Sequence, residues 1–155
     1  MEPDTLFDET RLLFHALKRW AEALHHGLGL TVPMRAVLEL ALRKGPRTVP
    51  DMARLRGVSR QHVQQQVDVL LERGLVERVE NPAHKRSPRI ALTDQGRALI
   101  QNMRARELEV LGRMQVGVSD HAAQEAAHVL SAWRAALRKD IDRRAGSSFL
   151  EGAKG

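Results

Sequence analysis

The stretch VSRQHVQQQVDVLLERGLVERV, at residues 58–79, decides the fold of this chain. Its first part carries apolar side chains at the spacing of one helix face: Val63, Val67, Leu70 and Leu71. Gly74 then interrupts the pattern, and an apolar run rich in Val follows, as in a β-strand. The stretch therefore predicts a helix at about 59–73 that leads directly into a strand.

The residues on either side complete a winged helix-turn-helix pattern. Thr48 with Asp51 forms a capping box that starts a short helix, and Gly57 ends this helix before the next one begins. A helix, a turn containing Gly and a second helix are the helix-turn-helix arrangement. Downstream, Asn81-Pro82 starts a turn, and Pro88 is expected at a strand edge or start. We therefore expect a DNA-binding lobe at 31–100, with a two-stranded wing at about 75–92.

Long amphipathic helices are predicted outside this lobe, at 6–28 and within 101–144. Their apolar stripes exceed what a lobe of about 70 residues can cover, so packing against a second copy of the chain is the economical arrangement. A monomeric helical layer is the alternative. The expected fold is mainly α with a small β-wing, and residues 145–155 are expected to be disordered. The residues expected in the dimer interface are Leu13, Leu17, Trp20, Leu130, Trp133 and Leu137.

The excess positive charge of the chain lies entirely in the predicted lobe. Residues 31–100 hold 13 Lys and Arg against 7 Asp and Glu, whereas the rest of the chain holds 12 of each. A basic lobe favours a polyanionic partner, although a solvated surface is the simpler explanation of a modest charge. All five aromatic rings lie outside the lobe, which lacks the stacking platform typical of single-strand binders. Double-stranded DNA is therefore the predicted partner.

The helix at 59–73 shows a polar face opposite its apolar stripe. Glutamine can pair bidentately with adenine in the major groove, and a run of three glutamines is unusual for a merely solvated surface, which is the alternative. Ser59 is expected to cap the helix and thereby to point backbone amides at phosphate. The predicted DNA contacts of this helix are Ser59, Arg60, Gln61, Gln64 and Gln65.

The predicted wing places cationic groups around a tight turn. An Arg can enter a narrow minor groove, while Lys85 would contact phosphate. A charged hairpin that only protects a sheet edge is the alternative. The predicted wing contacts are His84, Lys85, Arg86 and Arg89.

Several other classes of protein find no support in the sequence. The chain has no cysteine, which excludes disulfides and thiolate chemistry. It contains no HExxH, GxSxG or GxxxxGK[ST] pattern, so we expect no enzyme, catalytic residue, cofactor or metal site. No signal peptide or membrane-spanning run is present, which predicts a cytoplasmic protein without a membrane partner. Scattered histidines leave a metal-responsive regulator open, and nonspecific duplex packaging is a further alternative.

The segment from Thr31 to Gly96 resembles the MarR family of bacterial winged-helix regulators. The resemblance is carried by Val58-Ser59, by LERGLVER at 71–78, by NPAHKR at 81–86 and by LTDQG at 92–96. It implies a homodimer whose first, fifth and sixth helices interlock. It also implies binding to a pseudo-palindromic operator, as a repressor, and release when a small-molecule effector occupies the cleft between dimer core and DNA-binding lobe.

The chain departs from the family pattern in the wing. Family members commonly carry Asp two residues before the wing arginine, where this chain has His84 before Arg86. An Asp would orient the arginine through an ion pair, which a neutral histidine cannot do and a charged one opposes. Another group is therefore expected to brace Arg86, or else the wing is looser.

Overall fold

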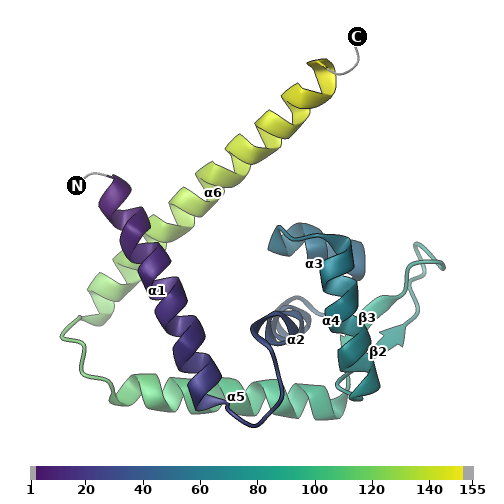
Figure 1. The fold of residues 1–155 in the computed structure, drawn as a ribbon, viewed down its shortest axis with the longest axis horizontal. Helices are drawn as coiled ribbons and strands as arrows, with labels where there is room; N and C mark the ends of the chain where they lie inside the picture. The colour runs from purple at the N-terminus through teal and green to yellow at the C-terminus, as the bar shows by residue number, and fades with distance from the viewer. Residues whose placement is uncertain (1–2, 152–155) are drawn as a thin grey trace. The chain divides into compact units, whose positions relative to one another are not determined.

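The computed structural model describes residues 3–151, and the side chains of residues 4–145. The chain divides into two compact units, residues 1–112 and 113–155. The described part of the first unit contains α1 (Pro3–Leu24), α2 (Val32–Lys44), β1 (Arg47–Thr48), α3 (Val49–Arg56), α4 (Arg60–Glu72), β2 (Val76–Val79), β3 (Arg89–Leu92) and all but the last residue of α5 (Asp94–Arg113). The second unit contains α6 (Asp120–Glu151). This is the predicted, mainly helical fold with a small β-wing (Figure 1).

The helices begin where the sequence predicts caps. Thr31 Oγ1 accepts a hydrogen bond from Met34 N, and Thr48 Oγ1 accepts one from Asp51 N. Thr93 Oγ1 likewise accepts from Gly96 N at 3.0 Å and donates to the carbonyl of Gly74 at 2.7 Å. These bonds satisfy amides that a helix start leaves unpaired, and the Thr93 bonds also tie α5 to the end of α4.

The helix-turn-helix packs on α2, the strands and α5 around one core. In Figure 1, α3 and α4 lie beside the β2–β3 hairpin, and α5 leaves from the base of this hairpin. The largest fully buried side chains come from α2, α3, α4 and α5: Val37, Leu38, Met52, Val63, Val67, Leu70 and Ile100. The core thus holds α4 rigidly while its other face stays open to solvent.

The sheet has one strand more than the sequence predicts. β1 pairs antiparallel with β3, with Thr48 opposite Arg89, so the strand order is β1-β3-β2. β1 is only two residues long, lying between two prolines, and so carries no alternating pattern. Pro88 directly precedes β3, as predicted, where its missing amide costs no sheet hydrogen bond.

The ends of the outer helices also differ from the prediction. α1 ends at Leu24, and residues 25–28 form a turn and a bend instead of the predicted helix. α6 continues to Glu151, so residues 145–151 are helical where disorder was expected; the remainder of the predicted tail, 152–155, lies outside the described residues. The chain has no proline after Pro88, so nothing stops the helix sterically. None of the helices within residues 3–151 combines the length and apolarity of a membrane span.

Candidate nucleic-acid interface

Helix α4 separates its buried and open faces as the sequence predicts. Val63, Val67 and Leu70 are fully buried, whereas Arg60, Gln61 and Gln65 are exposed. Ser59 caps the helix, because its Oγ accepts a hydrogen bond from His62 N at 3.1 Å. The helix N-terminus is therefore built as expected, with free amide dipoles beside an exposed arginine.

Among the four side chains predicted to contact bases, Gln64 is the one that already makes a hydrogen bond within the protein. Its side chain is half-buried, and its Nε2 donates to Asp68 Oδ1 at 2.8 Å. The same oxygen lies 3.8 Å from Arg78 Nη2, on β2. Gln64 thus keeps its carbonyl oxygen and one N–H for a partner, in an orientation that Asp68 fixes. The sequence analysis gave no role to Asp68 or to Arg78.

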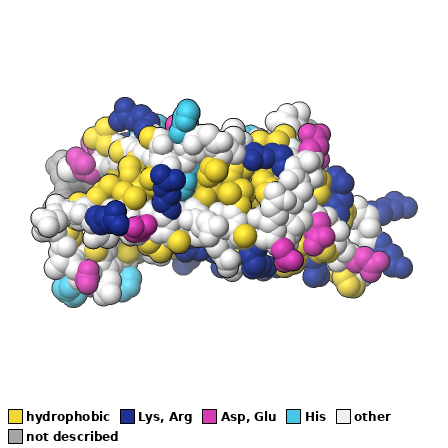
Figure 2. Space-filling view, turned by 90° about the horizontal axis from the view of Figure 1, so that it is seen from below, with side chains coloured by type: hydrophobic (Ala, Val, Ile, Leu, Met, Phe, Trp, Pro, Cys, Tyr) yellow, Lys and Arg dark blue, Asp and Glu magenta, His cyan; other side chains and the backbone are white. Residues whose placement is uncertain are grey.

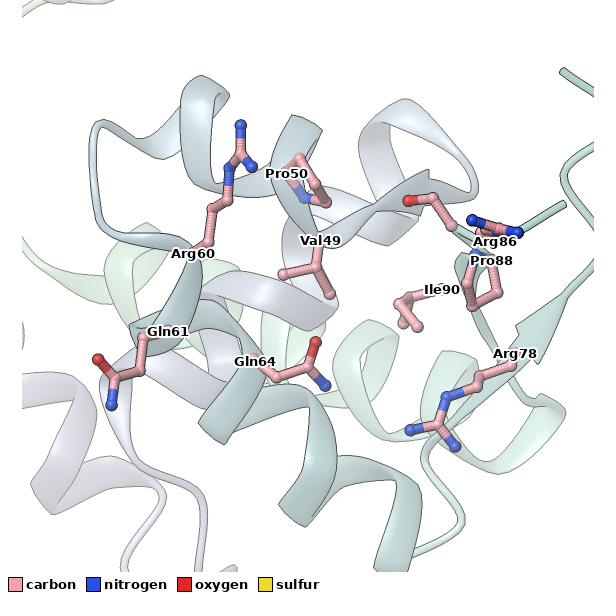
Figure 3. Close-up of a pocket in the computed structure, with 10 residues that line it drawn as sticks. Val49, Pro50, Arg60, Gln61, Gln64, Arg78, Arg86, Pro88 and Ile90 are labelled. Carbon is pink, nitrogen blue, oxygen red and sulfur yellow. The ribbon is translucent and has the colours of Figure 1, made fainter. Parts of the chain in front are cut away.

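A groove of about 360 Å³ runs between α4 and the wing. Figure 3 shows Gln64 pointing from α4 into the space in front of Arg78, with Arg86 and Pro88 across from Val49 and Pro50. Ten residues line the groove: Val49, Pro50, Arg60, Gln61, Gln64, Arg78, Arg86, Ser87, Pro88 and Ile90. Three of them are arginines and none is acidic, which suits a polyanion with hydrogen-bonding edges.

The wing is braced through its backbone by Asn81. This side chain is buried, and its Nδ2 donates to the carbonyl of Ser87 at 2.9 Å. His84 N donates to the carbonyl of Asn81, and Ser87 N donates to the carbonyl of His84, both at 3.0 Å. Among the side chains of residues 4–145, no carboxylate pairs with Arg86. The turn is therefore held in shape, while the Arg86 guanidinium stays available for a ligand.

A second hollow lies on the other side of the wing. His84 and Arg89 line it together with Arg47 and Arg60, and Asp51 is the one acid among its lining residues. Sequence reasoning missed Arg47 because β1 carried no pattern of its own. Lys85 lines neither hollow and is exposed at the wing tip. Figure 2 shows Lys and Arg side chains projecting at the end of the molecule that carries the wing, on the right.

A buried charge cluster ties α5 to the start of the lobe. His25 Nε2 lies 2.8 Å from Glu107 Oε1, and Arg35 of α2 donates to both oxygens of Glu107 and, through Nε at 3.0 Å, to Glu39. Burial alone would raise the pKa of Glu107, but its hydrogen bonds with Arg35 and His25 hold this pKa below the ordinary value. Burial would lower the pKa of Arg35, but the hydrogen bonds of Arg35 to Glu107 and Glu39 outweigh this effect. The pKa of Arg35 is therefore raised above its ordinary value.

The cluster borders a cavity of about 220 Å³ between the end of α1, α2 and α5. Its wall combines the ionisable side chains of Glu22, His25, His26 and Arg35 with the apolar side chains of Leu30 and Met103. His15, Arg19 and Trp20, which lie earlier on α1, do not line it. Among the side chains described, those of residues 4–145, no three His, Asp or Glu groups converge as metal ligands would.

The apolar stripes of the outer helices are open to solvent. On α1, Leu13 is 54% and Leu17 is 45% exposed, and Trp20 is half-buried. Figure 2 views the side on which α5 lies in Figure 1 and shows hydrophobic side chains open to solvent there. The second unit, taken by itself, also exposes its predicted interface residues: Leu130, Trp133 and Leu137. Stripes of this size are typical of an interface.

Comparison with known proteins places this geometry in a family. A sequence model of the MarR family matches residues 26–87. An uncharacterized protein of Mycobacterium tuberculosis is 37% identical over 93 residues, which are 60% of this chain and 65% of that protein. The chain thus spans less than two thirds of this relative. The crystal structure of a MarR family transcription regulator is 30% identical, with a TM-score of 0.74, and the match covers 88% of this chain and 95% of that one.

Two further solved structures share the fold at lower identity. A mutant MarR from E. coli, complexed with operator DNA, has a TM-score of 0.71 at 18% identity, over 83% of this chain and 92% of that one. Staphylococcus aureus MarR in complex with salicylate and kanamycin has a TM-score of 0.74 at 16% identity, over 88% and 93%. At these identities the likeness shows the fold alone.

Proposed function

The chain belongs to the MarR family, and we propose that it is a DNA-binding transcription regulator that acts as a homodimeric repressor on a pseudo-palindromic operator. The groove between α4 and the wing is the observation that carries the proposal. It presents Arg60, Arg78 and Arg86 beside Gln64, with no acidic residue in its lining. In this proposal, α4 enters the major groove and the wing contacts the neighbouring backbone or minor groove.

Each predicted contact has a role that follows from its place. Arg60, Gln61, Gln64 and Gln65 lie in the first half of α4 and read base edges, while Ser59 directs the helix N-terminus at a phosphate. Lys85 and Arg86 are exposed on the wing and contact phosphate and the minor groove. His84 and Arg89 line the second hollow with Arg47, where they neutralise an adjacent phosphate.

The exposed stripe of α1 supports the homodimer. Leu12, Leu13, Phe14 and Leu17 are all at least 45% exposed, a larger apolar stripe than an isolated surface helix usually shows. A second copy of the same chain covers this stripe and sets two α4 helices about 34 Å apart, one turn of B-DNA. Leu13→Glu should give a monomer in sedimentation, whereas Lys18→Glu, on the polar side of α1, should stay dimeric.

The cavity beside Arg35 supports release by a small organic anion. Its lining sets three basic side chains, against one acidic side chain, beside apolar ones, and this mixture suits an aromatic carboxylate. Salicylate is bound by the S. aureus neighbour, which makes it the first probe. Occupancy of this cavity would move the end of α1 against α5 and misplace the two DNA-binding lobes.

Selection of bound duplexes from random DNA tests the proposal. We expect an inverted repeat with half-sites one helical turn apart, and weaker binding when salicylate is added. Equal affinity for every duplex would show a nonspecific packaging protein instead. If salicylate and related acids do not change the binding to a preferred operator, the proposed repressor function stands, but the proposed release by an effector is wrong.

A further inference from the structure

Arg73, at the C-terminal end of α4, forms hydrogen bonds with the loop between α1 and α2. Its Nη1 donates to the carbonyl of Gly29 at 2.6 Å, and its Nη2 donates to the carbonyl of Leu28 at 2.9 Å. A planar guanidinium that holds two successive carbonyls fixes orientation as well as distance. The end of the recognition helix is thereby fastened to a segment more than 40 residues earlier in the chain.

The same loop is fastened to α5 at its start. The His25–Glu107 bond is nearly enclosed, since the two side chains are only 7% and 12% exposed. Arg35 holds the other side of Glu107 and belongs to α2, which follows the loop. Residues 25–31 therefore link α5, through His25, to α4, through Arg73.

The loop conformation that Arg73 requires depends on glycine. Gly29 has φ +62°, a conformation that other residues adopt only with strain. A Cβ added there would lie 3.6 Å from Arg73 Nη1, in ordinary contact. Glycine is therefore favoured at position 29 because of the backbone conformation and not for lack of space. This conformation turns the Gly29 carbonyl toward Arg73.

A basic residue on a recognition helix suggests a phosphate contact, but the geometry of Arg73 opposes this. Each Nη group donates one N–H to a carbonyl of the protein itself, which holds the guanidinium against the loop. Along a helix that rises 1.5 Å per residue, Arg73 lies about 20 Å from Arg60, at the end away from the predicted base readers. Its position suits control of the helix rather than contact with DNA.

We propose that Arg73 is a positioning residue that holds α4 relative to α1 and α5, and that it thereby sets the operator half-site spacing which the protein accepts. This inference rests on the proposed dimer on two half-sites. One added base pair moves a half-site by about 3.4 Å and turns it by about 35°. A DNA-binding lobe held to the end of α1 at Arg73 cannot follow this change, whereas a lobe released there can.

The test measures dissociation constants of the full chain for the selected operator and for versions one base pair longer or shorter. We expect wild type to lose about tenfold in affinity or more for either change. Arg73→Ala should bind the best operator more weakly, yet lose no more than about threefold on the altered ones. Its salt slope should equal that of wild type, because no phosphate contact is removed.

Two further variants keep the comparison decisive. Arg73→Lys can donate to one carbonyl but cannot span both in a plane, and it should fall between wild type and Arg73→Ala. Arg106→Ala removes the same charge from an exposed position of α5 and should behave as wild type. Cooperative unfolding on heating shows whether Arg73→Ala is folded. If it is not, the spacing measurement is made with Arg73→Lys alone.

The contrary results are distinct. A salt slope lowered by about 0.9 would make Arg73 a phosphate contact and overturn the inference. An unchanged spacing penalty in the folded variants would overturn it as well, while leaving the proposed function intact. A wild-type protein indifferent to spacing would overturn both.

Discussion

The start of α5 lies so close to the end of the helix-turn-helix that a Cβ on Gly96 would come within 1.8 Å of the carbonyl oxygen of Leu75. This carbonyl also accepts a hydrogen bond from Thr93 N at 3.2 Å. The contact involves backbone on the Leu75 side, so no side-chain movement can relieve it. Gly96 thus fixes where α5 leaves the DNA-binding lobe.

Gly96→Ala is therefore expected to destabilise the protein by roughly 3 kcal/mol, because backbone must shift to admit the methyl group. Gly112→Ala is the matched control on the same helix, since an added Cβ there meets no atom within 4 Å. It should be neutral or stabilise by up to about 1 kcal/mol. Urea unfolding followed by circular dichroism measures both, and equal midpoints would refute the close approach.

Glu107→Gln tests the buried charge cluster. The pKa of Glu107 lies below its ordinary value in the folded protein, so its ionised form stabilises the fold above the unfolded pKa. This stability is lost as pH falls through the folded pKa. We expect the variant to be less stable by about 2 kcal/mol at neutral pH and to differ less from wild type in acid. Unfolding free energies compared between neutral and acidic pH give the answer; a difference independent of pH would contradict it.

Gln65→Ala should weaken binding to the selected operator by roughly 1 to 3 kcal/mol and blur the preference at one base position of each half-site. Gln65 is exposed on the open face of α4, where it can reach a base edge. Duplex selection with the variant measures the preference. Gln101→Ala, at an exposed position of α5, is the control, and an unchanged base preference in Gln65→Ala would show that the reading face is misassigned.

Asp68→Asn should change the base that Gln64 prefers without removing a DNA contact of its own. The substitution weakens the attraction of Arg78 and releases the Gln64 amide from a charged acceptor. We expect the selected sequence to change at the position that Gln64→Ala also alters. Changes at a different position would mean that Asp68 itself reads a base.

Lys85→Ala should lower affinity equally for operator and unrelated DNA and reduce the salt slope by about 0.9. Lys85 sits at the exposed wing tip and lines neither hollow, so it contributes charge rather than shape. Titrations at several salt concentrations measure the slope. Loss of affinity for the operator alone would assign Lys85 a specific contact instead.

The sequence by itself determined the local structure of the DNA-binding lobe. The stripe of Val63, Val67 and Leu70 fixed which face of α4 is buried, and the hydroxyl side chains at 31, 48, 59 and 93 fixed where helices begin. These signals are short-range: helical periodicity and capping act within about four residues, so they can be recognised without the fold.

Tertiary structure alone decided how these pieces are joined. The pairing of β1 with β3, the Asp68–Arg78 contact, the grip of Arg73 on Gly29 and the His25–Glu107 bond link residues up to 82 positions apart. Such contacts follow from how helices and strands pack around the core, and they leave no periodic trace in the chain. The sequence likewise did not reveal what braces the wing. We expected a partner of the Arg86 side chain, whereas Asn81 holds the wing through the carbonyl of Ser87.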